Sequence, residues 1–443
     1  MKAFRTRKSN MITGVLLCLI LFAAGASARA VQAEGKDTVL EVGLFAGSNW
    51  DVANANSFVI IDKAIARFEE DHPGVKVHYY SGIRKEDYSE WLSRKLLSGD
   101  EPDLFVVLDS DFNLFCSLGI LQDLEELIQK DDSFEREQYF STALKSGEYH
   151  GVQYALPYET VPVLMFVNKT LLDREGIEMP GEDWTWDDLY DICSRVSRDT
   201  DGDQKLDQYG VCNYGWKDAC YANGAALFAE NGSAAYLTNP EVSEALRFLR
   251  RLEGLSQGDL VTQEDYNHGN VAFMPLNFAE YRTYKTYPDK IKKYDNFEWD
   301  CLTMPAGYSG GNISRIDSLV IGISRFSKEK NLAWEFLKLL TYDQDIQTDI
   351  FRYSQGASVL RPVTQSEEME MILLQDMEKG DTVISGELLG TVIENGHTES
   401  HFGQYIQAMS MADSRITEII EGNNLIDTEL KILQREIDSI LGS

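Results

Sequence analysis

Short apolar runs alternate with stretches of helical periodicity along the first third of the chain. The apolar runs, rich in Val, Leu and Phe, are residues 39–45, 75–80 and 104–108. The helical stretches between them are residues 57–68 and 88–97. In the first helical stretch, Phe58, Ile61, Ile65 and Phe68 fall on one stripe. This alternation of strands and helices predicts an α/β sheet.

A second alternating set begins near residue 161. The apolar run 161–167 follows a Pro-Tyr-Glu turn and ends at Asn168 and Lys169, where a short helix through Leu171 and Leu172 begins. Later strands are expected at 271–276 and 319–323, and later helices at 332–340, 405–420 and 427–441. The order along the chain does not by itself assign each strand to a sheet.

A capping box marks the start of one helix. Thr185 can accept a hydrogen bond from the backbone of Asp188 while the Asp188 carboxylate reaches back to Thr185. In the helix that follows, Leu189, Ile192 and Val196 fall on one face. The helix leads into an acidic loop at residues 199–207.

Several segments, in one fixed order, resemble landmarks of the extracellular solute-binding proteins of sugar-type ABC importers, which share the architecture of the maltose-binding protein. These segments are residues 68–77, 98–107, 118–128, 151–210, 269–281 and 318–341. The resemblance covers most of the chain after residue 36. It implies a two-lobed, type II periplasmic-binding-protein-like α/β fold, in which each lobe is a sheet flanked by helices and three chain crossings form a hinge.

The resemblance also implies domain boundaries. Lobe 1 is expected to contain residues 34–156 and 276–325, and lobe 2 residues 157–275 and 326–443. The three crossings are then expected near Pro157, Pro275 and Arg325. Binding between two such lobes couples closure to contact with the ligand.

The N-terminus has the layout of a secretory signal peptide. Residues 1–33 contain five basic residues and no acidic one, with an apolar core at 11–24 and small residues before a cleavage site after Ala33. An uncleaved membrane anchor is the alternative. Lipid attachment at Cys18 is disfavoured, because Leu17 precedes it and apolar residues follow it. The protein is therefore expected outside the cytoplasm, and the resemblance implies retention near a bacterial cell membrane.

Charge and cysteine content narrow the choice of partners. The chain carries a formal net charge of −31, which disfavours binding to nucleic acid. Five Cys follow the signal segment, far too few for a disulfide scaffold; Cys212 and Cys220 either pair across a loop or stay as buried thiols. No repeat or wall-anchoring tail indicates a structural module, and a monomer is expected.

Carboxylates, amides and aromatic rings at strand ends and crossings are candidate ligand-binding residues, because sugars are bound by such groups. In lobe 1 and at the first crossing they are Asn49, Trp50, Arg84, Asp109, Asp111, Tyr158 and Glu159. Farther along the chain they are Trp216, Tyr221, Asn277, Tyr281 and Asn312. Purely structural roles stay open for three of them: local packing for Trp50, a helix cap for Asp109 and a hairpin turn around Asn312. Relatives often have Gly-Pro-Trp where this chain reads Leu276-Asn277-Phe278. The chain therefore lacks that Trp for stacking on a sugar ring.

The acidic loop partly matches the spacing of a calcium-binding EF-hand loop. Asp199, Asp201, Asp203 and Asp207 occupy places 1, 3, 5 and 9, and Lys205 offers a carbonyl at place 7. Place 6 is Gln204 rather than Gly, and place 12 is Gly210 rather than a bidentate Glu. A structural calcium site and a solvated turn are both open, and no other cofactor is expected.

Enzymatic motifs are missing from the sequence. It contains no GxSxG, HExxH, Walker A or GxGxxG run, and its six His have no metal-ligand spacing. The sequence therefore predicts a non-enzymatic solute-binding protein that captures a carbohydrate, expected to be an oligosaccharide, and delivers it to an ABC permease. The alternatives are a receptor for a polyol, a glycerol phosphodiester or a peptide, and a secreted carbohydrate-active enzyme with paired carboxylates.

Overall fold

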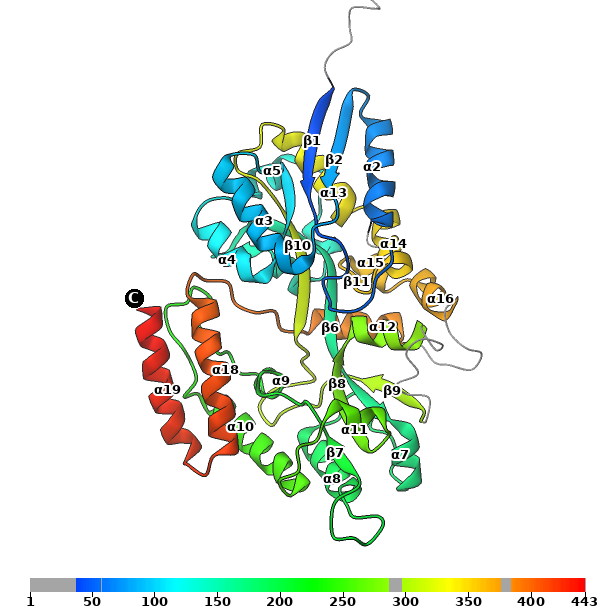
Figure 1. The fold of residues 1–443 in the computed structure, drawn as a ribbon, viewed down its shortest axis with the longest axis vertical. Helices are drawn as coiled ribbons and strands as arrows, with labels where there is room; N and C mark the ends of the chain where they lie inside the picture. Colours follow the sequence, from blue (N-terminus) through cyan, green and yellow to red (C-terminus); the bar gives the residue numbers. More distant parts are fainter. Residues whose placement is uncertain (1–36, 57, 287–296, 376–383, 443) are drawn as a thin grey trace, which may run out of the picture.

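The computed structural model describes residues 37–56, 58–286, 297–375 and 384–442, and it has two lobes (Figure 1). The strands of lobe 1, in spatial order, are β2 (Val75–Tyr80), β1 (Thr38–Gly43), β3 (Leu104–Val107), β10 (Ile316–Ile323) and the first half of β6 (Ala155–Asn168). β1 is parallel to β2 and β3, whereas β10 is antiparallel to β3 and β6. The predicted strand–helix alternation is therefore confirmed here.

Lobe 2 is built on the second half of β6. There β6 pairs with β8 (Val271–Asn277) and with β9 (Trp299–Leu302), and β8 pairs with β7 (Tyr209–Val211). β6 is nearly continuously apolar and buried along its 14 residues, as expected for a strand covered on both faces. Because β6 belongs to both lobes, all nine main strands form one hydrogen-bonded network.

Helices cover both sheets. One buried cluster fills lobe 1 and continues onto one face of the lobe 2 sheet, at Phe166, Val271 and Met274, and a second cluster fills the rest of lobe 2. The helices of lobe 1 are α2 (Val59–Asp71), α3 (Lys85–Ser98), α4 (Asp109–Ser117), α5 (Glu125–Lys130), α6 (Ser141–Lys145), α13 (Lys330–Thr341), α14 (Gln344–Tyr353), α15 (Arg361–Thr364), α16 (Glu367–Gln375) and α17 (Gly386–Glu394). Those of lobe 2 are α7 (Lys169–Arg174), α8 (Trp186–Val196), α9 (Trp216–Ala222), α10 (Pro240–Glu253), α11 (Gln263–Asn267), α18 (Tyr405–Glu421) and α19 (Ile426–Leu441). The predicted capping box of Thr185 and Asp188 is present at α8, and Leu189, Ile192 and Val196 are buried.

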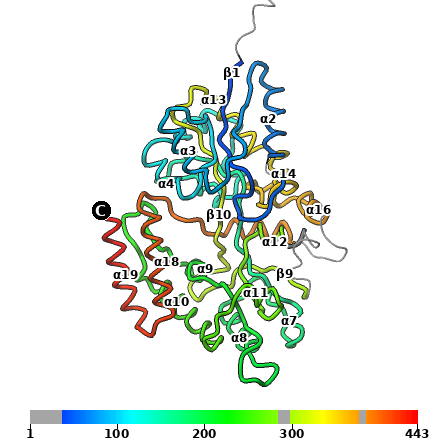
Figure 2. The backbone as a smooth tube through the Cα atoms, viewed as in Figure 1, coloured from blue at the N-terminus to red at the C-terminus, as the bar shows by residue number. Residues whose placement is uncertain are grey.

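The hinge consists of three segments that lie side by side. β6 passes from one lobe to the other, β10 enters lobe 1 from the lobe 2 loop 303–315, and residues 395–404 lead from α17 to α18 (Figure 2). Val163 N donates to Arg315 O (2.9 Å), Ile316 N to His397 O (2.8 Å), and His397 N to Ser314 O (2.8 Å). The three-crossing hinge is confirmed, but its second and third crossings lie near Arg315 and His397 rather than Pro275 and Arg325.

The expected domain boundaries are corrected accordingly. α13 and α14 pack on α2 of lobe 1, and α17 packs on α6, so residues 326–394 do not belong to lobe 2. Conversely, β9 and the loop after it join lobe 2, where Asn312 donates to Trp184 O (2.9 Å). The reason is pairing: β9 continues the sheet of lobe 2, whereas the apolar faces of α13 and α14 can be buried only against β10, β6 and α2.

The predicted signal peptide lies within residues 1–36, which the structure does not describe. Among the residues that it does describe, no helix combines the length and apolarity needed to span a bilayer. The five described Cys are all buried free thiols, so the pairing of Cys212 with Cys220 is not formed.

Helix α12 (Phe278–Thr286) joins the two lobes through Arg282. α12 directly follows β8 of lobe 2, yet the Arg282 guanidinium donates to the carbonyls of Ile350 (3.1 Å), Ser354 (2.6 Å) and Gly356 (3.1 Å) at the C-terminal end of α14. Its side chain is 5% exposed. A cation at this end of a helix satisfies carbonyls that lack helical partners and opposes the negative end of the helix dipole.

We expect Arg282→Met to lower the free energy of unfolding by about 3 kcal/mol, because several buried carbonyls lose charged hydrogen-bond donors. Urea denaturation followed by circular dichroism measures the loss. The matched control is Arg94→Met, since Arg94 is 71% exposed and, within the described part of the chain, its ion pair is the one with Glu90 at 3.3 Å; its effect should stay below about 0.5 kcal/mol. Equal effects of the two substitutions would contradict a bracing role for Arg282.

Candidate functional site

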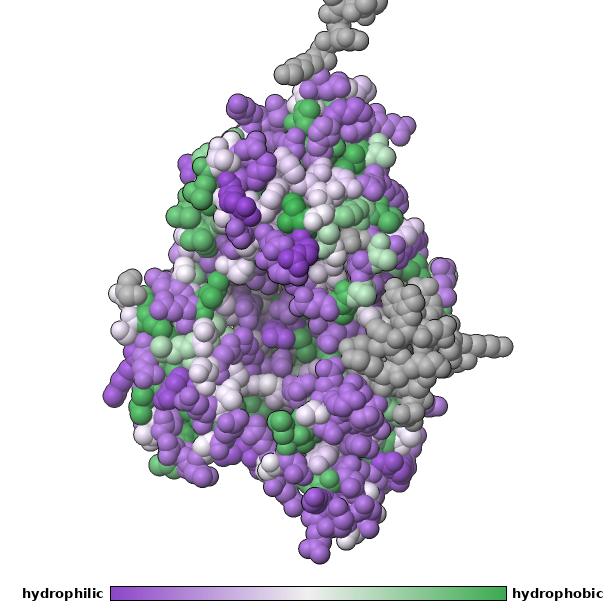
Figure 3. Space-filling view, viewed as in Figure 1, coloured by the Kyte–Doolittle hydropathy of each residue, from purple (hydrophilic) through white to green (hydrophobic). Residues whose placement is uncertain are grey.

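The surface is hollowed between the lobes, and polar side chains line the recess (Figure 3). A cavity of about 600 Å³ lies at this junction. Lobe 1 contributes the turn at 145–151, lobe 2 contributes residues 221–231, and the third crossing contributes residues 397–405. The cavity is therefore lined by both lobes and by the hinge, so a molecule in it would touch every part that moves during closure.

Charged side chains from both lobes and the hinge form a cluster at this junction. We call it the hinge cluster and define it as Asp109, Lys217, Asp218, Arg315, Asp317 and Glu399. Lys217 Nζ lies 3.6 Å from Glu399 and 3.4 Å from Asp413. Arg315 Nε lies 3.8 Å from Asp317. The local pairing of strand and crossing explains this convergence, because Arg315 and His397 form a parallel bridge.

Asp109 is the cluster member contributed by lobe 1. It begins α4 directly after β3, and its side chain is exposed although protein surrounds it on most sides. That combination is typical of the wall of a cleft. Loss of hydration, together with repulsion from Asp317 and Glu399, raises the pKa of Asp109 to about 7. A carboxyl group that titrates near neutral pH in a cleft is typical of a functional site.

Aromatic and imidazole rings line the neighbouring cavity. Tyr221 stacks on His397 with ring centroids 3.9 Å apart, and Tyr405 is also part of the cavity wall. Burial lowers the pKa of His397 to about 4, so its ring is neutral at physiological pH. Across the cavity, Lys145 of lobe 1 donates to Glu230 of lobe 2 at 2.8 Å. The site thus combines the faces of aromatic rings with hydrogen-bond donors and acceptors.

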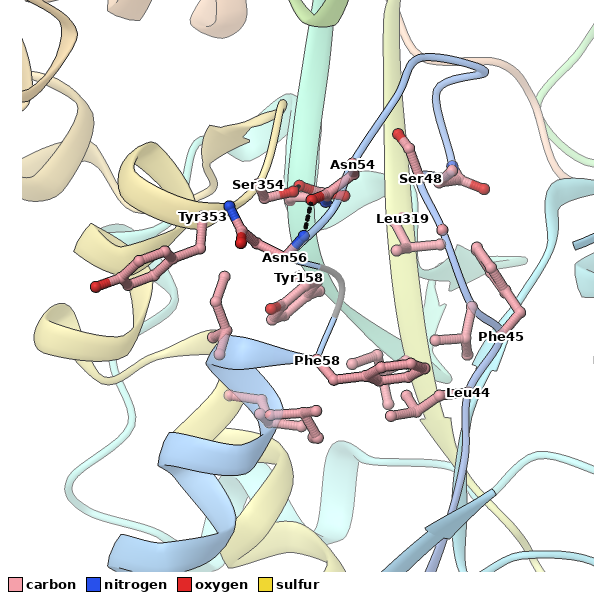
Figure 4. Close-up of a pocket in the computed structure, with 18 residues that line it drawn as sticks. Leu44, Phe45, Ser48, Asn54, Asn56, Phe58, Tyr158, Leu319, Tyr353 and Ser354 are labelled. Carbon is pink, nitrogen blue, oxygen red and sulfur yellow. Dashed lines mark hydrogen bonds between the residues drawn. The ribbon is translucent and has the colours of Figure 1, made fainter. Parts of the chain in front are cut away.

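Three predicted residues line a different space, a small cavity of about 70 Å³ beneath the loop after β1, and Trp50 belongs to that loop. Asn49, Tyr158 and Glu159 line it together with apolar side chains such as Phe45, Phe58 and Leu319, as Figure 4 shows for the labelled ones. Trp50 Nε1 donates to Glu159 at 2.9 Å, and Ser354 donates to the other carboxylate oxygen. Trp50 and Glu159 thus fasten the loop to β6.

Six further predicted residues have partners in the structure. Arg84 pairs with Asp87 at 2.7 Å, Asp111 accepts from Ser89 at 2.6 Å, and Trp216 donates to Asp413 at 2.9 Å. Asn277 and Glu280 cap each other at the start of α12, the buried Tyr281 hydroxyl accepts from Ile384 N at 3.0 Å, and Asn312 holds the backbone of Trp184 and Met304. The remaining two of the twelve candidates lie at the interlobe junction. Tyr221 lines the cavity there, and Asp109 belongs to the hinge cluster.

Sequence reasoning missed most of the hinge cluster. Arg315 and Asp317 belong to a strand whose first residues look like a polar loop, and Glu399 lies between two predicted helices. A signal existed in the polar run 395–404, NGHTESHFGQ, which is too long for a helix link and carries two His and one Glu. An expected third crossing near Arg325 places this run inside lobe 2 rather than at the hinge.

The acidic loop brings three of its four carboxylates together. Asp199, Asp201 and Asp207 place one oxygen each within 4.8 Å of one another. Asp203 instead accepts from the backbone N–H of Lys205 at 2.8 Å. Gln204, where an EF-hand has Gly, takes a left-handed backbone with φ 72°. The oxygen donors fit a hard cation, although backbone N–H groups already satisfy several of them, so calcium stays a prediction.

This arrangement, two α/β lobes joined by three crossings with a cavity between them, defines the class of two-lobed binding proteins. The chain belongs to the bacterial extracellular solute-binding protein family, whose model matches residues 63–372. The families and structures it resembles are binding proteins rather than enzymes.

Individual relatives are distant in sequence but close in fold. A binding protein of Brucella abortus is 24% identical over 297 residues, and the maltotriose-binding protein of Pyrococcus abyssi is 24% identical over 206 residues, which cover 45% of this chain and 41% of that protein. The match to the Brucella protein covers 62% of this chain and 66% of that protein's length. The cyclic α-maltosyl-1,6-maltose-binding protein of Arthrobacter globiformis superposes with a TM-score of 0.74 at 16% identity, covering 91% of this chain and 99% of that one. The sugar-binding protein of Xanthomonas citri gives 0.73 at 14% identity, covering 91% and 98%.

Asp109→Asn is expected to stabilise the protein above neutral pH. Because the pKa of Asp109 is raised on folding from 3.8 to about 7, ionisation opposes folding increasingly as pH rises from the unfolded value through the folded one. The melting temperature of the variant should exceed that of wild type at about pH 8, and the gap should close towards about pH 4. The control is Asp132→Asn, at an exposed position just after α5, whose melting temperature should show no such dependence on pH. A variant less stable than wild type at high pH would refute this assignment.

If the acidic loop binds calcium, adding the ion should raise the melting temperature and a chelator should lower it, because the ion binds only the folded loop. The double variant Asp201→Asn, Asp203→Asn should abolish the response while Asp132→Asn keeps it. A wild-type melting temperature indifferent to both calcium and chelator would identify the loop as a solvated turn.

Proposed function

We propose that this protein captures a carbohydrate, most simply an oligosaccharide, in the interlobe cavity and presents it to an ABC permease. The cavity of about 600 Å³ carries the proposal. Its volume falls in the range of about 300–1,000 Å³ found for small-molecule sites. Its walls offer what a sugar needs: the rings of Tyr221 and Tyr405 for C–H faces, and Glu399, Thr398 and Ser400 for hydroxyl groups.

The relatives support the same solute class. The Arthrobacter and Pyrococcus proteins are named for cyclic maltosyl-maltose and for maltotriose, and a Listeria monocytogenes substrate-binding protein, with a TM-score of 0.66 and 19% identity, was solved with cycloalternan. The protein acts as a monomer outside the cytoplasm, without turning over its solute. Its permease contacts require both lobes in the closed arrangement, which a solute touching both lobes favours.

The test is a thermal-shift screen followed by scattering. Malto-, cello-, xylo- and manno-oligosaccharides are compared with polyols, glycerol phosphodiesters and peptides, because a solute that binds only the folded protein must raise its melting temperature. The expected result is a shift with at least one oligosaccharide, a smaller radius of gyration in its presence, and the same sugar recovered intact.

If a polyol, phosphodiester or peptide raises the melting temperature and no sugar does, that solute rather than a carbohydrate is the ligand. Recovery of a cleaved sugar would identify an enzyme. Tyr221→Ala is expected to weaken sugar binding by about 2 kcal/mol in calorimetry, as loss of an anchoring ring does. Tyr236→Ala is the control, since Tyr236 is 37% exposed and lies outside the cavity.

A further inference from the structure

The turn after α6 in lobe 1 contacts lobe 2 at two places. Lys145, the last residue of α6, donates to Glu230 of lobe 2 at 2.8 Å. Nδ1 of His401, at the lobe 2 end of the third crossing, donates to the carbonyl oxygen of Glu148 at 2.9 Å. The His401 ring also packs on Phe112 of α4, with ring centroids 4.7 Å apart. The contact between Lys145 and Glu230 thus joins the lobes outside the three crossings.

The lobe 2 side of this contact moves as one unit. Glu230 lies in the turn 228–235, whose two ends pair as an antiparallel bridge. Gly232 in this turn has φ 68°, and a Cβ atom there would lie 2.5 Å from the ring of Phe402. The turn is therefore seated on Phe402, which directly follows His401 in the chain. Glu230 and His401 consequently keep a fixed position relative to each other.

The lobe 1 side is fixed to β6. The carbonyl of Gly147 accepts from the backbone N–H groups of Tyr154 at 2.9 Å and of Ala155 at 3.2 Å. A Cβ atom on Gly147 would lie 2.0 Å from the carbonyl oxygen of Ala155, so the turn 145–148 is pressed against the start of β6. Because each side is fixed within its own lobe, the distance between the two sides changes when the lobes move.

The energy of the ion pair is small for folding but sufficient for a balance between lobe arrangements. The side chains of Lys145 and Glu230 are 53% and 85% exposed, and such pairs contribute little to the free energy of unfolding. An equilibrium between two arrangements of one folded protein is shifted by any contact made in only one of them. An exposed ion pair changes an equilibrium of this kind about two- to fivefold.

We propose that Lys145, Glu148, Glu230 and His401 form an interlobe clasp. While the clasp is engaged, it holds the two lobes in the arrangement of this structure, and it must release before they separate. All four residues line the interlobe cavity, so release of the clasp also widens that cavity. The inference concerns the motion of the lobes, and it does not depend on which solute the protein binds.

The experiment measures the distance between the lobes without any solute. Spin labels are attached to Glu90→Cys in α3 of lobe 1 and to Asp191→Cys in α8 of lobe 2, two side chains that are 76% and 67% exposed. The five described native Cys are buried, so the reagent is directed to the two introduced thiols. Pulsed electron paramagnetic resonance then gives the distribution of distances between the labels, at low and at raised salt.

Lys145→Glu and Glu230→Lys each place two like charges at the clasp. Each is expected to raise the population outside the wild-type distance peak at least about twofold at low salt, and less at raised salt, which screens the repulsion. The double variant Lys145→Glu, Glu230→Lys restores opposite charges and should restore the wild-type distribution. His401→Phe keeps a ring against Phe112 but loses the bond to Glu148, so it should shift the distribution in the same direction as the single reversals.

The matched control is Lys130→Glu, which breaks an ion pair of 2.5 Å with Glu126 inside lobe 1, at side chains 70% and 75% exposed. It should leave the distribution unchanged. Glu230→Gln, the mildest change at the clasp, keeps the test decisive if a charge reversal does not fold. Single reversals that retain the wild-type distribution would overturn the clasp, and so would a double variant that stays as displaced as the single ones. Because no solute is present, these outcomes leave the proposed carbohydrate function untouched.

Discussion

One strand supports the backbone of both lobes. β6 pairs with β10 and β11 (Ala357–Ser358) in its first half and with β8 and β9 in its second, so each lobe depends on the same 14 residues. The hinge therefore bends around a strand that is anchored at both ends. At Val163 the pairing of β6 changes from β10 to β8, and there Val163 N donates to the carbonyl of Arg315, which also forms the bridge to His397.

The position of the charges follows from this constraint. Because the crossings meet at Arg315 and His397, side chains one or two residues away are brought to the base of the cleft whatever their separation in the chain. Asp317 and Glu399 arrive there from the hinge, Asp109 from a strand end of lobe 1, and Lys217 from the first turn of α9 in lobe 2. Relative motion of the lobes must change the distances within this set, so the electrostatics of the site and the hinge are coupled.

Much of the fold could be predicted from the sequence because it depends on local patterns. The strands at 39–45, 75–80 and 104–108, the capping box of Thr185 and the helices near the C-terminus depend on periodicity and capping within a few residues. Strand assignment does not: whether α13 and α14 belong to one lobe or the other is decided by which distant apolar face remains to be covered. The same limit applies to the site. Trp50 and Glu159 have the residue types of a sugar site, yet they bond to each other, a contact 109 residues apart in the chain.

The interleaving of the lobes has a consequence for how the molecule becomes folded. The core of lobe 2 includes Ile416, Leu433 and Ile437, from the last two helices, together with residues such as Leu171 and Leu189 made far earlier. The core of lobe 1 similarly includes residues of α13 to α17, so it is incomplete until those helices have been synthesised. Neither lobe can bury its apolar surface until nearly the whole chain has been synthesised, and such long-range contacts form slowly. The nascent chain consequently lacks both finished cores for most of its synthesis, a state compatible with passage through a narrow translocation channel but exposed to aggregation and proteolysis until the C-terminal helices have been made.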